Sequence, residues 1–290
     1  MQRLFDSHAH LNNETYTADE RAALIREIES SAVTRVMDIG FDLASSRLAA
    51  EHAARLAWCY AAVGVHPHDA DSMDEDTLAE IRRLAGLDKV QAIGEIGLDF
   101  HYDNSDREAQ VYWFRRQIRL ANELRLPIVI HSREADQLTL DILVEEGAFS
   151  EERKSWFLQR LIPGGKPAGD ARVLLHCFSG SRELGQQYVK LGATLSVAGP
   201  VTYKNNRRTV EMVAAIPLEY LLAETDAPYL TPVPFRGRPN KSPYVEHTVR
   251  KIAEIKGISY EEAAERTFCN AEVFFNIDEH KQPDINIGHK

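Results

Sequence analysis

The feature that most constrains the fold is an alternation of strand-like and helix-like segments along nearly the whole chain. Short apolar runs rich in β-branched residues recur at 3–5, 33–39, 59–65, 90–98, 126–131, 172–178, 193–199 and 220–226. The amphipathic stretches expected to form helices between them are 18–31, 43–57, 74–86, 105–125, 133–147, 181–191, 206–216 and 243–257. Nearly continuous apolar strands that alternate with helices predict a parallel sheet covered by helices.

Eight such units in about 250 residues predict an α/β protein with a closed (β/α)8 TIM barrel. A doubly wound open sheet is the alternative, but GEIGLD carries only two glycines of its phosphate-binding fingerprint. We expect a single domain over 1–276 that ends in a helix at 259–276. A loop insertion is expected at 148–171, and a polar tail of low order at 277–290.

The composition is that of an ordinary soluble globular protein. The formal net charge of −10 argues against a protein that coats duplex DNA, because such binding depends on lysine and arginine. Cys59, Cys177 and Cys269 form no CxxC pair, which favours reduced thiols in a cytoplasmic protein. Cys177 follows His176, and we expect it to be a small buried side chain rather than a nucleophile. No apolar run is long enough for a membrane span, and we expect a monomer.

Polar residues follow most of the predicted strands, at the end of a barrel where active sites are built. In chain order these motifs are DSHAH, GVHPHD, GEIGLD, VIHSRE, LLHCFSG and AETDAPYL. Strand two ends in DIGFD, to which the sequence assigns no role.

Six residues in these motifs are of the types that bind metals. His8 and His10 are two residues apart, so they project to the same face of a strand. The others are Glu95, His131, His176 and Asp226. Each alone is as easily explained by a hydrogen bond, an ion pair or a helix cap. Together they exceed the ligands of a tetrahedral structural zinc and suit a two-metal centre about 3.5–4 Å across.

The motifs DSHAHLN, GVHPH, IGEIGLDFHY, LPIVIHSREA, LLHCFSG and ETDAPYLTP, taken in order, resemble the TatD family of metal-dependent deoxyribonucleases, within the amidohydrolase-like barrels. The resemblance runs from about residue 4 to 275. It implies a (β/α)8 fold, phosphodiester hydrolysis, divalent-metal dependence and often 3′-5′ exonuclease action. The family's metal ligands fall on the same six residues. The chain departs from the family in the long 148–171 stretch and in LSVAGP at 195–200.

The predicted mechanism assigns catalytic roles to Asp226 and Glu95. Two divalent ions would lower the pKa of a bridging water from about 15.7 towards 7. Asp226 would accept the proton of that water, and Glu95 would bridge the ions. Oxygen ligands favour Mg²⁺ or Mn²⁺, whereas four imidazoles favour Zn²⁺, so both remain open.

Basic residues in the loops after strands seven and eight, where barrels commonly bind phosphate, are Lys204, Arg207, Arg208, Arg236, Arg238 and Lys241. We expect Arg236, then Lys204, to bind substrate, together with His66 after strand three; a solvated basic face is the alternative. Phe100, Tyr102, Tyr203 and Phe235 are candidates for stacking on a base or for ordinary packing.

The expected function is therefore 3′-5′ exodeoxyribonuclease activity on nucleic acid, most simply at single-stranded ends. The alternatives are a related metallohydrolase of a small ester or amide, or a D-aminoacyl-tRNA deacylase. A non-catalytic scaffold is disfavoured because all six ligands are present.

Overall fold

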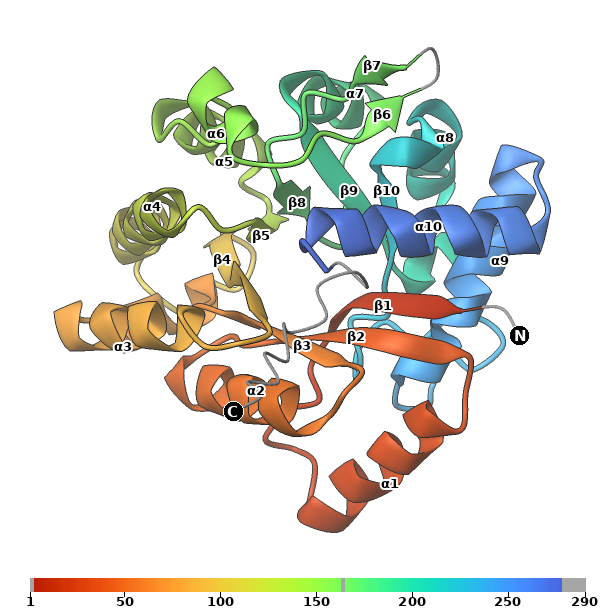
Figure 1. Cartoon of the computed structure of the whole chain (residues 1–290), viewed down its shortest axis with the longest axis horizontal. Helices are drawn as coiled ribbons and strands as arrows, with labels where there is room; N and C mark the ends of the chain where they lie inside the picture. Colours follow the sequence, from red (N-terminus) through yellow and green to blue (C-terminus); the bar gives the residue numbers. More distant parts are fainter. Residues whose placement is uncertain (1–2, 163–164, 278–290) are drawn as a thin grey trace, which may run out of the picture.

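The computed structural model describes residues 3–162 and 165–277, and it contains one eight-stranded parallel sheet (Figure 1). The strands, in their spatial order, are β1 (Leu4–Ala9), β2 (Val33–Ile39), β3 (Cys59–Val63), β4 (Val90–Asp99), β5 (Ile128–Arg133), β8 (Val173–Leu175), β9 (Ala193–Val197) and β10 (Leu221–Ala223). An isolated bridge between Ala9 and Ala227 joins the last strand region to the first. The predicted (β/α)8 barrel is confirmed.

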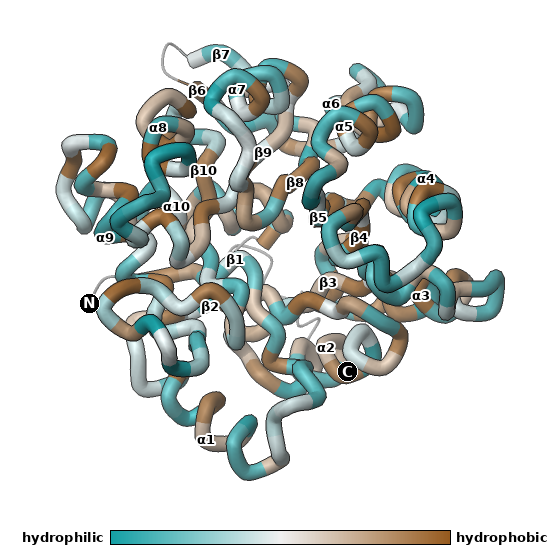
Figure 2. The backbone as a smooth tube through the Cα atoms, turned by 180° about the vertical axis from the view of Figure 1, so that it is seen from behind, coloured by the Kyte–Doolittle hydropathy of each residue, from teal (hydrophilic) through white to brown (hydrophobic). Residues whose placement is uncertain are grey.

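Helices lie between the strands and after the last one, and all but α10, which lies across one end, cover the outside of the barrel (Figure 1). They are α1 (Ala18–Glu29), α2 (Leu43–Arg55), α3 (Glu75–Ala85), α4 (Arg107–Leu124), α5 (Asp136–Glu145), α6 (Glu151–Ser155), α7 (Arg182–Leu191), α8 (Arg207–Ala215), α9 (Val245–Lys256) and α10 (Tyr260–Phe274). Short 3₁₀ segments are η1 (Pro67–Ser72), η2 (Gly199–Thr202), η3 (Leu218–Tyr220) and η4 (Ser242–Tyr244). Figure 2 shows apolar and polar stretches alternating along these helices, as expected when one face packs on the sheet.

The sixth and eighth strands of the barrel, β8 and β10, are shorter than the sequence predicted. β8 covers 173–175 instead of 172–178, and β10 covers 221–223 instead of 220–226. The backbone leaves the sheet near Cys177 and Asp226, whose φ angles of 43° and 57° are left-handed. The strands therefore stop where the polar motifs begin.

The barrel interior is closed at its N-terminal end by α10. Phe5, Met37, Val129 and Leu222 from the strands belong to one buried cluster with Phe268 of α10. Phe5 contacts Phe268 edge to face, with 6.0 Å between the ring centres. The polar motifs selected from the sequence lie at the opposite end, where the strands end.

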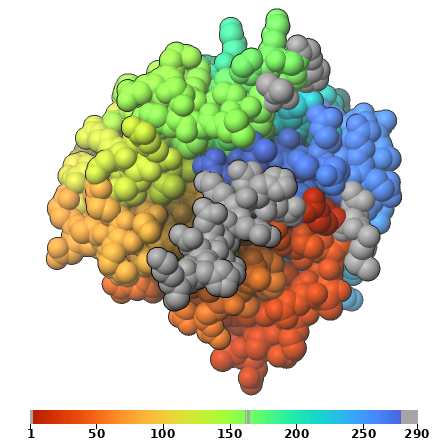
Figure 3. All heavy atoms as spheres, in the orientation of Figure 1, coloured from red at the N-terminus to blue at the C-terminus, as the bar shows by residue number. Residues whose placement is uncertain are grey.

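The 148–171 segment is not the simple loop that the sequence predicted. It contains α6 and the antiparallel pair β6 (Leu161–Ile162) and β7 (Lys166–Pro167), and its green atoms form part of the surface in Figure 3. A buried group of four residues, which we call the arginine cluster, fastens it to the barrel; the group is Arg153, Arg160, Asp170 and Arg172.

The arginine cluster lies at the N-terminal ends of the strands. Asp170 Oδ2 lies 2.8 Å from Arg160 Nε and 3.3 Å from Arg172 Nε. Arg153 donates to the carbonyl oxygens of Ala171 and Leu126, both at 2.8 Å. The three buried guanidiniums thus face one carboxylate and several backbone carbonyls.

Several predictions of sequence analysis stay predictions. These are the single domain over 1–276, the monomeric state and the cytoplasmic location. The predicted tail, 277–290, lies outside the described residues beyond Ile277. Among the described residues, no helix has the length and apolar character that crossing a membrane requires.

Candidate metal centre

All six predicted ligands lie together at the C-terminal end of the barrel. We call them the rim cluster: His8, His10, Glu95, His131, His176 and Asp226. Ligand atoms within 4.8 Å of one another occur in two sets drawn only from these residues, His8–Glu95–His176 and His8–His10–Asp226. A third set joins His66 to Glu95 and His131.

His8 and His10 enter from the end of β1. Their Nε2 atoms lie 3.2 Å apart. The pairing of β1 with β2 shifts register between Asp6 and Ala9, the part of the strand that contains His8. The predicted common face is therefore correct. Asp226 Oδ1 lies 3.7 Å from His8 Nε2 and 3.4 Å from His10 Nε2, so three side chains enclose one small space.

Glu95 of β4 is the centre of the rim cluster. Its Oε1 lies 2.7 Å from His176 Nε2 and 3.0 Å from His131 Nδ1, and its Oε2 lies 3.3 Å from His8 Nε2. One carboxylate thus lies between the imidazoles of three different strands.

The two glycines of GEIGLD allow β4 to approach β5 closely. A Cβ at Gly94 would lie 2.6 Å from Val129 Cβ, and one at Gly97 would lie 1.9 Å from the carbonyl oxygen of His131. Gly97 also has a φ of 148°, which side chains disfavour. The motif therefore places Glu95 and His131 side by side.

Asp226 is placed by contacts between β1 and the chain that follows β10. Its backbone N–H donates to His8 O at 2.9 Å. One residue earlier, Thr225 donates through its N and Oγ1 to the buried Asp6 carboxylate, at 2.8 and 2.6 Å. The hydrogen bonds between Thr225 and Asp6 thus hold the segment that carries Asp226 beside the end of β1.

Two imidazoles have their outer nitrogen bound to an acceptor, so that a lone pair faces the rim cluster. His10 Nδ1 lies 2.8 Å from Ile39 O, and His131 Nε2 lies 3.0 Å from Asp99 Oδ2. Since these acceptors require N–H, the nitrogens that face inward are His10 Nε2 and His131 Nδ1, both unprotonated in the neutral ring. Second acceptors of this kind orient metal-binding histidines in proteins. The donor set therefore fits divalent cations.

The carboxylates and imidazoles of the rim cluster shift one another's pKa values. Burial alone would raise the pKa of Glu95, but the surrounding imidazoles, His176 above all, hold it well below its usual range. Burial likewise opposes the charge of His176, yet the carboxylates of Glu95 and Glu224 raise its pKa well above normal. Without a cation, these carboxylates favour a proton on His176.

His66, predicted to bind substrate, lies beside the cluster. Its Nε2 is 3.5 Å from Glu95 Oε1, and its Nδ1 accepts from the backbone N–H of His68 at 3.1 Å. Burial first, then the nearby His131, lowers its pKa well below the usual range. A neutral ring whose Nδ1 accepts must carry its hydrogen on Nε2, so His66 presents a donor to the site.

The other predicted substrate residues lie farther out on the surface. Arg236 is exposed, and its guanidinium lies 4.2 Å from the ring centre of Tyr203. Lys204, the residue after Tyr203, is also exposed. Within the predicted basic group, Lys241 pairs with Glu27, and Arg207 lies 3.4 Å from Glu211. Binding of substrate by Arg236 and Lys204 remains a prediction.

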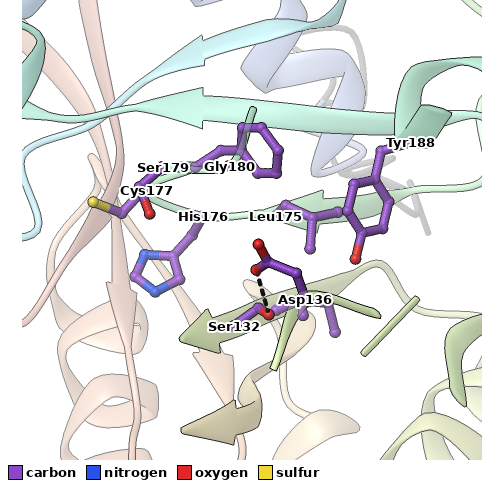
Figure 4. Close-up of a pocket in the computed structure, with 10 residues that line it drawn as sticks. Ser132, Asp136, Leu175, His176, Cys177, Ser179, Gly180 and Tyr188 are labelled. Atoms are coloured by element: carbon purple, nitrogen blue, oxygen red, sulfur yellow. Dashed lines mark hydrogen bonds between the residues drawn. The ribbon is translucent and has the colours of Figure 1, made fainter. Parts of the chain in front are cut away.

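Cys177 is partly exposed rather than buried. Burial of its thiol nevertheless raises its pKa well above the usual range, followed by the charges of Glu224 and Asp226, which disfavours a nucleophilic thiolate. Figure 4 shows the small pocket behind His176, lined by Ser132, Asp136 and Tyr188 among others, with the Cys177 sulfur turned away from Tyr188.

Sequence reasoning missed the buried acids that orient the site. Asp99, the last residue of GEIGLD, accepts from His131 and from His68, both at 3.0 Å. Glu224 accepts from Cys177 N at 2.7 Å and lies 3.6 Å from His176 Nδ1. Asp99 ends β4 and Glu224 directly follows β10, both within motifs selected from the sequence. Their position at strand ends was therefore the signal that could have identified them.

Strand two, which had no assigned role, also supports the site. Besides binding His10, Ile39 O accepts from Asn12 Nδ2 at 2.8 Å. Asp38 accepts from the buried His52 at 2.7 Å and from Asn12 N at 3.2 Å. The end of β2 therefore holds the segment that follows β1.

Comparison with known proteins places the chain among metal-dependent hydrolases. The family described as TatD related DNase matches residues 5–276. The chain is 42% identical over 275 residues to the uncharacterized metal-dependent hydrolase YabD of Bacillus subtilis, covering 95% of this chain and 100% of YabD. It is 33% identical over 280 residues to the 3′-5′ ssDNA/RNA exonuclease TatD of Erwinia amylovora, covering 94% and 100%.

The fold comparison agrees. The crystal structure of the TatD homologue YjjV of Escherichia coli K12 superposes with a TM-score of 0.82 at 26% identity, covering 95% of this chain and 99% of YjjV. The predicted enzyme class, a metal-dependent hydrolase, is confirmed. The chain belongs to the TatD-related DNase family.

Proposed function

We propose that the protein is a divalent-metal-dependent 3′-5′ exonuclease that removes nucleotides from single-stranded ends, with DNA as the expected substrate. The observation that carries this proposal is the convergence of four imidazoles and one further carboxylate around Glu95. Relatives named 3′-5′ ssDNA/RNA exonuclease support the substrate class.

The metal ligands are assigned from the two sides of the rim cluster. His8, His10 and Asp226 form one side, His131 and His176 form the other, and Glu95 lies between them. When bound, two divalent cations supply Lewis acidity that lowers the pKa of water and neutralises phosphoryl charge. Mg²⁺ or Mn²⁺ is expected, with Zn²⁺ as the alternative.

Asp226 is the proton acceptor in this scheme. Its pKa is lowered: burial opposes the charge, but the hydrogen bond to His10 and the nearby His8 outweigh burial. The carboxylate is therefore ionised and takes a proton from the attacking water. The water oxygen bonds to phosphorus, the bond from phosphorus to the strand's 3′-oxygen breaks, and the proton passes to that oxygen.

His66 and the outer cations bind the substrate. The Nε2–H of His66 is available to donate to a phosphoryl oxygen, and Arg236 and Lys204 attract the strand. Arg236→Ala is expected to raise KM with little change in kcat, most at low salt, where charge is least screened. If Arg236→Ala had the same KM as the wild type at every salt concentration, Arg236 would belong to a solvated basic face and not to the substrate site.

The test uses metal-stripped protein supplied with Mg²⁺, Mn²⁺ or Zn²⁺. Labelled single-stranded DNA, duplex DNA, RNA and a D-aminoacyl-tRNA are offered to the wild type, to Asp226→Asn and to the exposed control Asp141→Asn. We expect shortening of single-stranded DNA from the 3′ end by the wild type and the control only. Equal activity in Asp226→Asn would overturn the mechanism, and deacylation without cleavage of any strand would overturn the substrate.

A further inference from the structure

We infer that Tyr102 and Tyr229 are the base-stacking side chains of this site, one for each nucleotide that flanks the scissile phosphodiester. The inference rests on the proposed function and adds that both flanking bases must be unpaired. An exposed aromatic ring alone needs no ligand. Three observations distinguish this pair: its position on both sides of the rim cluster, the contacts that hold the two rings, and its exposure compared with the other predicted rings.

The two rings flank the rim cluster from opposite walls of the barrel. Tyr229 lies beside His10, with 6.3 Å between ring centres. Tyr102 lies 5.6 Å from the ring of His68, which shares the Asp99 carboxylate with His131. His10 follows β1 and His131 is on β5, and the sheet order separates these strands by three strands on either side.

Both rings are exposed and yet fixed. The side chains are 55% and 54% exposed for Tyr102 and Tyr229. The Tyr229 hydroxyl accepts from Nδ2 of the buried Asn13 at 3.0 Å. The Arg133 guanidinium lies 4.6 Å from the centre of the Tyr102 ring, where it adds positive charge for the strand's phosphates. Rings held in this way lose little conformational freedom when a base stacks on them.

The other aromatic residues predicted for base stacking are less exposed than Tyr102. Phe235 stacks on Tyr244 with ring centres 4.3 Å apart, and Tyr203 lies under Arg236 and donates its hydroxyl hydrogen to Thr231 O at 2.9 Å. Phe100 lies under Arg107, at 4.5 Å. Tyr102 is thus the one of the four predicted rings that is more exposed than covered.

Two stacking rings on either side of a hydrolytic centre select for single strands. Stacking on an aromatic ring is open to every base, so it gives little sequence preference. A base inside a duplex is already stacked and paired, and a few kcal/mol are needed to remove it. The substrate class is therefore an unpaired end with at least two intact bases.

The experiment measures a coupling between each tyrosine and one base. Fluorescein-labelled hexathymidylate is prepared with one residue at a time replaced by an abasic residue. Affinity is measured by anisotropy in EDTA and in Ca²⁺, and kcat/KM in Mn²⁺, for the wild type, Tyr102→Ala, Tyr102→Phe, Tyr229→Ala and Tyr229→Phe. Tyr112→Ala is the matched control, because Tyr112 is 50% exposed on α4 and bonds Arg116.

In the wild type, abasic substitution at two neighbouring positions should weaken binding at least about five-fold each. Tyr102→Ala should abolish the loss at one position and Tyr229→Ala the loss at the other, while both Phe variants and Tyr112→Ala keep both losses. Wild-type abasic losses in both Ala variants would overturn the inference even if strands are cleaved. Tyrosine-dependent losses in binding without cleavage would support it and overturn the proposed nuclease; absence of strand binding would overturn both.

Discussion

Two buried polar clusters lie at opposite ends of this barrel, and they balance their charge differently. In the arginine cluster, the guanidiniums of Arg160 and Arg172 lie against Asp170, and the guanidinium of Arg153 donates to Ala171 O and Leu126 O. In the rim cluster, imidazole nitrogens and carboxylates face one another, with His8 Nε2 and His10 Nε2 only 3.2 Å apart.

The difference indicates what each cluster is for. A buried charge costs free energy unless a partner inside the protein balances it. The arginine cluster contains its own partners and so fastens the 148–171 segment. The rim cluster instead brings four imidazoles and two carboxylates face to face, a donor set suited to divalent cations from solution. Changes in the rim cluster should therefore affect metal binding and activity, whereas changes in the arginine cluster should affect stability.

The largest effect is expected for Glu95→Gln. Because Glu95 lies between three imidazoles of the rim cluster, its loss should lower activity by more than about 100-fold. The increase in melting temperature on addition of Mn²⁺, a consequence of binding to the folded state alone, should disappear as well. Activity assays and calorimetric melting measure both, with the exposed Glu145→Gln as control. A normal metal-dependent increase in Glu95→Gln would contradict the assignment.

Asp170→Asn should lower the stability of the fold and leave metal binding and activity unchanged. Removing the carboxylate leaves the buried guanidiniums of Arg160 and Arg172 without their anion, which should lower the free energy of unfolding by about 3–5 kcal/mol. The loss should be the same with and without Mn²⁺, and activity per folded molecule should remain. Urea unfolding at both metal conditions measures it, with the surface Asp141→Asn as control. A change below 1 kcal/mol would show that the arginine cluster does not depend on Asp170.

Asp99→Asn should have an intermediate effect on the rim. The change keeps every proposed ligand but weakens the acceptor of His131 Nε2, and such changes typically cost about 10–100-fold in metal affinity or activity. Titration of metal-free protein with Mn²⁺ measures the affinity, and the exposed Asp103→Asn serves as control. Unchanged affinity would mean that His131 is not oriented by Asp99.

The smallest expected effect is a release of protons on metal binding. Burial opposes protonation of His10, His131 and His176, but neighbouring carboxylates outweigh it and raise all three pKa values. The metal-free protein gains stability from these protons below the ordinary histidine range and loses it as the pH rises through the raised values. Cations must displace the protons, so metal affinity should fall as the pH falls.

Calorimetric titration with Mn²⁺ in buffers of different ionisation enthalpy measures the number of protons released. Asp170→Asn should release as many as the wild type, because the arginine cluster takes no part. Binding without proton release at neutral pH would contradict the charge balance inferred for the rim cluster.

The same contrast explains what the sequence could and could not predict. His8, Glu95 and Asp226 were predictable because a barrel places the ends of distant strands at one rim. Asp99 and Glu224 were missed because their roles depend on which imidazole each one faces. The arginine cluster was missed because Arg153, in a segment interpreted as a loop, acquires its partners only through tertiary contacts.

We propose that the rim cluster holds two divalent cations, and anomalous diffraction from a crystal grown with Mn²⁺ would show where they bind. We predict two anomalous peaks about 3.5–4 Å apart. One should lie against His8, His10 and Asp226, the other against His131 and His176, with Glu95 between them. No peak in the rim cluster, with Mn²⁺ bound elsewhere or not at all, would contradict the account.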